Sequence, residues 1–132
     1  ETAMRRSEIT KLDWSQVHIK QKFVRLKRSK NEDARDVPLS KKAIALFKIM
    51  TPTTFGSVFK ISADTVSTMF KRAVIACKIQ NLTFHDTRHE ACTRLARKVD
   101  ILTLAKILGH RDTKSLLIYY NPTATEIAEL LG

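Results

Sequence analysis

The sequence lacks the features that would place the protein in a membrane or in an oxidising compartment. No apolar run approaches the roughly 20 residues that a membrane-spanning helix needs, and there is no signal peptide. Only two cysteines, Cys77 and Cys92, occur in 132 residues, which is too few for a disulfide framework. These absences predict a cytoplasmic protein with reduced thiols and no membrane partner.

Internal repeats, low-complexity tracts and an interdomain linker are also missing, so we expect one domain over residues 1–132. A chain of this length can bury a hydrophobic core. The sequence begins with Glu-Thr-Ala-Met instead of a start methionine, which suggests a piece of a longer polypeptide.

Acidic residues are scarce, with 13 Asp and Glu against 24 Lys and Arg, and the formal net charge is +11. This imbalance says nothing about the fold, but it favours a polyanionic partner, of which nucleic acid is the first candidate. An anionic membrane surface is the competing partner. The basic residues are scattered, however, and no long basic amphipathic helix gathers them.

The N-terminal third predicts a short helix followed by strands. Residues 4–11 read as the end of a helix. Three strand candidates follow, at 14–19, 22–28 and 35–40. The first two are joined by a tight connection at Lys20-Gln21, and residues 29–34 supply polar turn chemistry for a hairpin. Pro38 has no N–H to donate, so the third strand should lie at an edge or end there.

The rest of the chain has the 3.6-residue periodicity of helices. Ser40 and Ser62 are N-cap candidates, Thr83 with Asp86 resembles a capping box, and Gly109 is a C-terminal stop. The predicted helices cover 41–50, 63–79, 84–98, 100–108, a segment from Asp112 to the tyrosines, and 124–131. Strands followed by helices predict an α+β domain, mostly helical, with a small three-stranded antiparallel sheet near the N-terminus.

A helix that starts at Phe84 places His85, Arg88 and His89 on one face. A guanidinium offers a phosphate a bidentate fork, and an imidazole offers it a hydrogen bond or a proton. Alone, His-x-x-Arg is a weak signal, because this spacing arises by chance in many helices. A solvated basic face is the simpler interpretation of these residues.

A zinc site is the competing interpretation, with His85, His89 and Cys92 at helical spacing and His110 elsewhere. Arg88 would repel a dication, and neither Cys-x-x-Cys nor His-Glu-x-x-His is present. We therefore expect no metal, a structural His89 and a small buried Cys92.

Three further candidates are weak when taken singly. His110 follows a glycine-terminated helix, where a sharp turn could aim its imidazole into a cleft. Lys30 stands at a hairpin tip, where it could reach a phosphate or protonate a leaving oxygen. Arg5 and Glu8 should share a helix face, so Glu8 could hold the Arg5 guanidinium in place. The simpler interpretations are an exposed loop histidine, a solvated turn lysine and a surface ion pair.

The order of these elements is far more specific than any one of them. Arg-x-x-Glu, a hairpin lysine, His-x-x-Arg opening a helix, Leu-Gly-His and a tyrosine nine residues later follow in sequence. This order resembles the catalytic half of the tyrosine recombinases, the phage integrase family. The resemblance covers essentially the whole chain, from Arg5 to the final helix.

The resemblance implies a site in which two arginines and two histidines surround a scissile DNA phosphate, a hairpin lysine is the general acid and a tyrosine is the nucleophile. Carried over by motif, these residues are Arg5, Lys30, His85, Arg88, His110 and Tyr119. Glu8 and His89 would support them, whereas Arg6 should face elsewhere. The implied activity is site-specific recombination through a 3′-phosphotyrosyl linkage, with no metal or other cofactor.

The resemblance also implies double-stranded DNA target sites and self-association into a synaptic tetramer. The DNA-clamping N-terminal domain of the full proteins is absent here, so we expect the chain alone to bind DNA weakly. In the final helix, Ile127, Leu130 and Leu131 form an apolar stripe. Packing on its own domain is the simpler interpretation, and docking on a neighbouring protomer is the one that the family suggests.

Two tyrosines stand side by side, and helical spacing separates them. A helix from Asp112 places one apolar set together: Thr113, Leu116, Leu117 and Tyr120. Tyr119 falls on the polar side with Ser115. We therefore predict Tyr119 for chemistry and Tyr120 for packing.

Two other functions compete with recombination. The charge and the missing clamping domain fit a non-catalytic DNA-binding module, which would bind DNA without forming an adduct. A type IB topoisomerase-like enzyme uses similar chemistry and would relax supercoils without a specific site. The framework of residues 35–40 and of Leu-Gly-His favours the recombinase over this enzyme.

Overall fold

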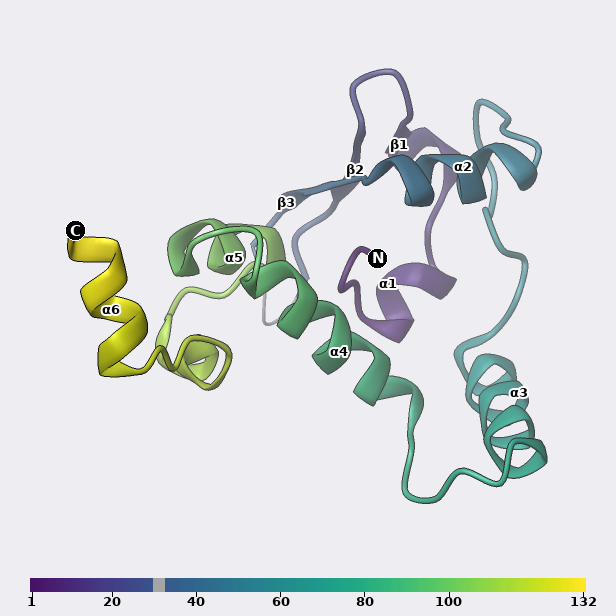
Figure 1. Ribbon diagram of the computed structural model, residues 1–132. Helices are drawn as coiled ribbons and strands as arrows, with labels where there is room; N and C mark the ends of the chain where they lie inside the picture. Colours follow the sequence, from purple (N-terminus) through teal and green to yellow (C-terminus); the bar gives the residue numbers. More distant parts are fainter. Residues whose placement is uncertain (30–32) are drawn as a thin grey trace.

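A three-stranded antiparallel sheet occupies the N-terminal part of the chain, in a computed structural model that describes residues 1–29 and 33–132 (Figure 1). Its strands are β1 (Val17–His18), β2 (Phe23–Leu26) and β3 (Arg35–Pro38), in the order β1-β2-β3. β3 therefore lies at an edge, and Pro38 is its last residue, opposite Phe23. The edge position predicted from the missing N–H is confirmed.

The strand predicted over 14–19 is wrong in its first half. A 3₁₀ turn, η1 (Trp14–Gln16), precedes the two residues of β1. Asp13 Oδ1 accepts a hydrogen bond of 2.9 Å from the Ser15 N–H, and Gln16 Oε1 accepts one of 3.0 Å from the Asp13 N–H. These side-chain bonds close a turn where the apolar pattern alone indicated extended backbone.

The helices agree with the predicted segments to within a few residues at most ends. They are α1 (Arg6–Thr10), α2 (Lys41–Ile49), α3 (Ala63–Ala76), α4 (Phe84–Ala96), α5 (Ile101–Leu108) and α6 (Ala124–Leu131). Ser40 and Ser62 accept backbone N–H groups as N-caps, and Asp86 Oδ2 accepts the Thr83 N–H. Gly109 ends α5 with φ +75°, the left-handed conformation that glycine adopts without steric cost. Mostly helical α+β architecture is confirmed.

Two segments differ from the predicted helices. α1 begins at Arg6, with Arg5 in extended backbone as its N-cap, so Arg5 does not lie inside a helix. The segment that reaches the tyrosines is a 3₁₀ helix, η2 (Lys114–Tyr119), instead of an α-helix. Asp112 Oδ1 accepts the Lys114 N–H at 2.8 Å, and this local bond holds the tight turn that opens η2.

The buried apolar residues form two clusters that meet at the N-terminal segment. One joins the sheet, α1 and α2, and includes Leu12, Trp14, Val24, Val37 and Phe47. The other joins α4, α5 and η2, and includes Cys92, Leu104, Leu108 and Leu116. Ala3 belongs to the second cluster and Met4 to the first. The next residue, Arg5, is therefore fixed at the junction of the two clusters.

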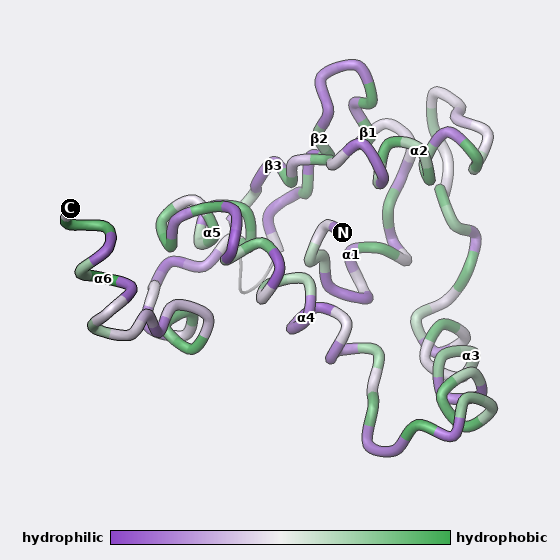
Figure 2. The backbone as a smooth tube through the Cα atoms, in the orientation of Figure 1, coloured by the Kyte–Doolittle hydropathy of each residue, from purple (hydrophilic) through white to green (hydrophobic). Residues whose placement is uncertain are grey.

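α3 and α6 lie at the margins of the molecule (Figure 1). α3 buries Val74 and contacts α4 through Phe70 and Phe84, whose ring centroids are 5.5 Å apart. α6 buries no residue, and hydrophobic and hydrophilic residues alternate along it (Figure 2). Within the described residues, no helix combines the length and the apolar character needed to cross a bilayer.

Candidate active site

Arg5 stands at the start of α1, held by its backbone. Its N–H donates to Glu8 Oε2 at 2.7 Å, the bond that a side chain three residues into a helix makes to the N-cap. Glu8 was expected to hold the Arg5 guanidinium, and its carboxylate accepts the Arg5 backbone N–H. Burial lowers the pKa of Arg5, and the nearby Arg88 guanidinium lowers it further.

Arg88 projects from the first turns of α4 and is 8% exposed. Its Nη1 donates to the Ala3 carbonyl at 2.6 Å. Ala3 has φ +53°, a left-handed conformation that is uncommon for a residue with a Cβ. Burial lowers the pKa of Arg88. A buried cation of this kind needs hydrogen-bonded partners, and the left-handed Ala3 supplies one.

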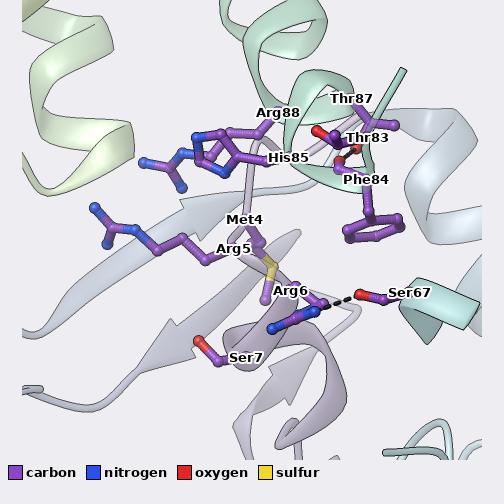
Figure 3. A pocket seen from close by; sticks show the side chains of 10 residues that line it. All are labelled: Met4, Arg5, Arg6, Ser7, Ser67, Thr83, Phe84, His85, Thr87 and Arg88. Carbon is purple, nitrogen blue, oxygen red and sulfur yellow. Dashed lines mark hydrogen bonds between the residues drawn. The ribbon is translucent and has the colours of Figure 1, made fainter. Parts of the chain in front are cut away.

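Arg5, His85 and Arg88 line one pocket of about 380 Å³ between α1, α3 and α4. Figure 3 shows the side chains of all three extending in the same direction along the pocket. Arg6 also lines this pocket, and its Nη1 contacts Ser67 Oγ on α3. Arg6 was expected to face elsewhere than Arg5, but both residues line this pocket. Two guanidiniums and an imidazole thus converge from elements 80 residues apart in the sequence.

His110 lies just beyond Gly109, where the chain leaves α5. Its Nδ1 is 2.9 Å from Ser115 Oγ. Burial lowers the pKa of His110, and the Arg88, Arg5 and Arg35 guanidiniums lower it further. The imidazole therefore belongs to the same electrostatic environment as the arginines of the pocket.

The lowered pKa of His110 predicts a pH dependence of stability. Below pH 6.5, the ordinary pKa of histidine, His110 binds a proton more readily in the unfolded chain than in the folded protein. The free energy of unfolding should therefore fall as the pH drops through and below about 6.5, and this loss should be smaller in His110→Gln. Urea denaturation of both proteins at about pH 7.5 and about pH 5.5 measures the difference. Equal losses in both proteins would contradict the expectation.

The structure separates the two tyrosines. The Tyr119 hydroxyl is 2.7 Å from His89 Nδ1, and the Tyr120 hydroxyl donates to the Val99 carbonyl at 2.6 Å. The helical face used to predict this separation is not formed, because η2 is a 3₁₀ helix. Leu116 is 1% exposed, whereas Leu117, placed on the same face, is 56% exposed.

Burial raises the pKa of Tyr119, and Cys92 raises it further, while Arg88 lowers it. The phenol is therefore protonated at neutral pH and needs a proton acceptor to become a nucleophile. His89 Nδ1 is within hydrogen-bonding distance of it. The His85 ring lies next in line, with its centroid 4.9 Å from that of His89.

Lys30, the predicted general acid, lies outside the described residues. Asp33, three positions later in the sequence, accepts two hydrogen bonds from Arg111, at 2.9 and 3.2 Å. Arg111 directly follows His110. Asp33 therefore lies close to the loop that carries His110.

Sequence reasoning missed Arg35. Its side chain is 6% exposed and contacts Glu8 and the Ile107 carbonyl, which are 27 and 72 positions away in the sequence. A strand that begins with arginine gives no local sign of such partners. Only the packing of α1, β3 and α5 brings them together.

A zinc site finds no support among the residues that the structure describes. Within them, no group of three or more His, Cys, Asp or Glu side chains is arranged to hold a metal ion. Cys92 instead is buried beside Tyr119 and Arg88. The pocket offers the guanidiniums of Arg5 and Arg88 and the imidazole of His85, which suit a phosphate. The Tyr119 phenol, a group that can act as a nucleophile, lies 2.7 Å from His89 Nδ1.

Comparison with known proteins adds three findings. The family model described as the phage integrase family matches residues 1–126. A putative integrase/recombinase of Haemophilus influenzae is 41% identical over 99% of this chain and 44% of its own length. A shufflon-specific DNA recombinase of Escherichia coli is 33% identical over 99% of this chain and 35% of its own. The chain thus spans less than half of either relative.

A solved structure has the same fold. The catalytic domain of the bacteriophage HP1 integrase superposes with a TM-score of 0.73 and 26% identity, over 99% of this chain and 76% of that one.

Proposed function

This chain belongs to the phage integrase family, and we propose that it is the catalytic domain of a site-specific DNA recombinase. Residues 1–132 would cleave and rejoin DNA strands through a 3′-phosphotyrosyl intermediate. The observation that carries the proposal is the Tyr119 hydroxyl 2.7 Å from His89 Nδ1, beside a pocket lined by Arg5, His85 and Arg88. A nucleophile, a proton acceptor and phosphate-binding groups are the parts that the reaction needs.

In the proposed reaction, the Tyr119 oxygen attacks the scissile phosphorus and its proton passes to His89. The bond from phosphorus to the 5′-oxygen breaks, and Lys30 protonates that oxygen as it leaves. The products are a tyrosyl 3′-phosphodiester and a free 5′-hydroxyl. Because one phosphodiester replaces another, a 5′-hydroxyl of a second strand can reverse the step and join new ends.

Arg5, Arg88 and His110 would stabilise the negative charge that grows on the non-bridging oxygens. Donors fixed before the reaction are worth several kcal/mol in such a role. If Ser115 donates to His110 Nδ1, the ring keeps its proton on Nε2, and Nε2 can donate to the phosphate even when the ring is neutral. The Ser115 contact of 2.9 Å is compatible with this tautomer.

Double-stranded DNA is the proposed substrate, and the net charge of +11 supports it. We place the DNA-clamping function of the family outside residues 1–132, so this chain alone should bind DNA weakly and lose affinity steeply with salt. Free thiols at Cys77 and Cys92 fit a cytoplasmic location.

A nicked target duplex tests the proposed function. The short fragment that carries the new 5′-hydroxyl diffuses away after cleavage, so the strand cannot be rejoined and the adduct is trapped. We expect a protein–DNA complex that survives denaturing electrophoresis and forms at an equal rate with and without EDTA. DNA binding with no adduct would point to a non-catalytic binding module. An adduct that a chelator prevents would contradict metal independence.

α6 supports self-association on DNA, since its apolar stripe is not covered by its own domain. Leu130 and Leu131 are 83% and 82% exposed, and Ile127 is 43% exposed. The simpler interpretation, packing on its own domain, is therefore wrong for this structure. We propose that α6 docks on a neighbouring protomer in a tetramer.

Changing Leu130 to Glu in α6 should reduce the synaptic complex on paired target sites by at least about tenfold, because it places a charge in an apolar contact. Cleavage of a single nicked site should stay within about twofold of the wild type. Native electrophoresis and the adduct assay measure the two effects. A synaptic complex of undiminished yield would contradict the docking role.

A further inference from the structure

Outside the predicted catalytic set, Arg35 forms an ion pair with Glu8 in which both side chains are largely buried. We propose that Arg35 is a positioning residue, whose guanidinium holds the start of α1 and the end of α5 in one fixed relation. These two segments carry Arg5 and His110. The geometry of this arrangement comes from the contacts described below. Its expected consequence, a loss of cleavage rate when Arg35 is changed, rests on the proposed function.

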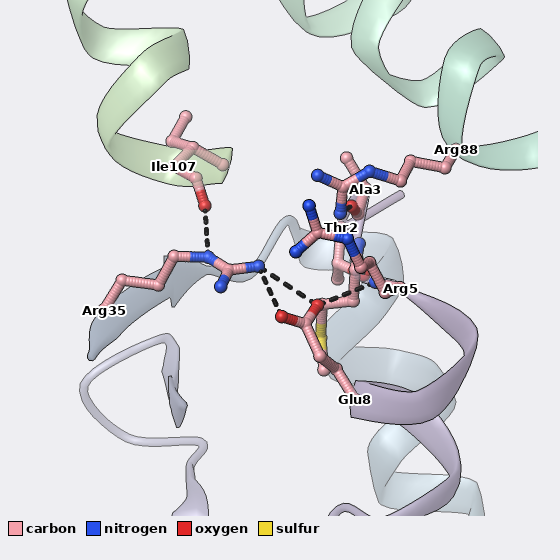
Figure 4. Close-up of polar contacts among 8 residues, drawn as sticks. Thr2, Ala3, Arg5, Glu8, Arg35, Arg88 and Ile107 are labelled. Carbon is pink, nitrogen blue, oxygen red and sulfur yellow. Dashed lines mark hydrogen bonds and ion pairs between the residues drawn. The ribbon is translucent and has the colours of Figure 1, made fainter. Parts of the chain in front are cut away.

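One guanidinium bonds to both segments (Figure 4). Arg35 Nε donates to the Ile107 carbonyl of α5 at 3.0 Å. Arg35 Nη2 contacts the two carboxylate oxygens of Glu8 at 2.8 and 3.0 Å. Glu8 Oε2 in turn accepts the Arg5 N–H at 2.7 Å. The chain of contacts therefore runs from the last turn of α5 to the backbone of Arg5.

These contacts are shielded from water. The Arg35 and Glu8 side chains are 6% and 16% exposed. Replacing a buried ion pair of this kind with apolar residues is often neutral or stabilising, so stability alone is a poor reason for its presence. The planar fork of arginine can meet two partners in fixed directions, which the single ammonium of lysine cannot do. Geometry, rather than charge, is what the residue contributes.

Close packing at Gly109 ties the same side chain to His110. Gly109 directly precedes His110, and a Cβ built on Gly109 would lie 2.8 Å from Arg35 Cδ. Arg35 thus packs against the backbone directly before His110. The carbonyl end of α5, which carries partial negative charge, also favours a cation at this place.

The cationic surroundings support this arrangement. Arg35 is among the groups that lower the pKa of both Arg5 and His110, so it lies within electrostatic reach of both. The negative charge of Glu8 has the opposite effect, since it raises the pKa of Arg5 and of Arg88. The Glu8 carboxylate, oriented by Arg35, keeps clustered guanidiniums together around the pocket.

The test compares Arg35→Lys with the wild-type chain on a nicked duplex. We expect the single-turnover cleavage rate at saturating DNA to fall about 10²-fold, the effect of a displacement of about 1 Å in a catalytic group. The Kd for the same DNA with an uncleavable phosphate should change less than about threefold, since the charge is kept. A residue with a merely structural role would not separate rate from binding in this way.

Gly109→Ala is a second variant, which leaves the Arg35 guanidinium intact but pushes against it. Gly56→Ala is its matched control, because Gly56 also has positive φ, +100°, with no atom within 4 Å of a built Cβ. We expect Gly109→Ala to lower the cleavage rate at least about tenfold more than Gly56→Ala. Equal effects of the two changes would overturn the proposal.

Hydrogen exchange provides a readout that does not need DNA. The amides of Ile9 and His110 bond to the Arg5 and Ala105 carbonyls, each at 3.0 Å, and report on the two segments. Both should lose protection together in Arg35→Lys and keep it in Gly56→Ala. Unchanged protection of these amides would overturn the proposal, as would an unchanged cleavage rate. If the wild-type chain formed no adduct, the proposed function would fail, and the exchange result alone would judge Arg35.

Discussion

Replacing Tyr119 with phenylalanine should abolish the covalent protein–DNA adduct on a nicked target duplex. The change removes one oxygen, the atom proposed to attack phosphorus, and no other group can substitute for it at that position. We expect the rate of adduct formation to fall by at least about a thousandfold, as for other lost nucleophiles. Denaturing electrophoresis of single-turnover reactions measures it.

Tyr120→Phe is the matched control, since it removes the same atom from the adjacent residue. Its hydroxyl donates to the Val99 carbonyl at 2.6 Å, on the side of the second hydrophobic cluster. Loss of this bond should cost about 0.5–1.5 kcal/mol of unfolding free energy and leave adduct formation within about twofold. Adduct that persists in Tyr119→Phe, or that disappears in folded Tyr120→Phe, would reverse the assignment of the two tyrosines.

Changing Arg88 to lysine should lower the cleavage rate by about 10²–10³-fold, the range for one lost donor to a reacting oxygen. The lysine ammonium keeps the charge but cannot both reach a phosphate and satisfy the Ala3 carbonyl, which Arg88 Nη1 contacts at 2.6 Å. The carbonyl left unpaired should also cost about 1–3 kcal/mol of unfolding free energy. Single-turnover kinetics and urea denaturation measure the two effects.

Arg94→Lys is the control on the same helix. Arg94 forms an exposed ion pair with Glu90 at 2.7 Å, one turn away. Such pairs are worth little, so the stability should change by less than about 0.5 kcal/mol and the cleavage rate should not change. If Arg88→Lys behaved like Arg94→Lys, Arg88 could not be a phosphate ligand of the reaction.

The helices and their ends were the most predictable part of the fold. α6 begins and ends where its sequence pattern does, and Ser40, Ser62 and Gly109 act as the expected caps. These features depend on side chains within a few residues of one another. Where local bonds competed with the hydrophobic pattern, as at Asp13, the pattern alone gave a strand that is partly a 3₁₀ turn.

Motif order selected the candidate residues, whereas their geometry did not follow from the sequence. Arg5, His85 and Arg88 do line one pocket, and Tyr119 lies at His89. The choice of Tyr119 over Tyr120 agrees with these contacts, although the α-helical face that was used to make it does not exist. The α-helical periodicity predicted that Leu116 and Leu117 are both on the apolar face, but only Leu116 is buried. A 3₁₀ helix has fewer residues per turn than an α-helix, so the two leucines do not share a face.

Arg35 shows what a single sequence cannot provide. Its partners come from α1 and α5, and each contact depends on how the two hydrophobic clusters are joined. No spacing rule connects residues 27 and 72 positions apart. Lys30 remains a prediction from motif order alone.

The most direct test of the account is to identify the residue that carries the DNA. The adduct formed on a nicked duplex is digested with nuclease and protease, and the modified peptide is sequenced by tandem mass spectrometry. We predict a nucleotide 3′-phosphate attached to Tyr119, in the peptide that contains Ser115 and Tyr120. A nucleotide on Tyr120 or on a histidine, or a wild-type chain that binds the duplex without any modified peptide, would contradict it.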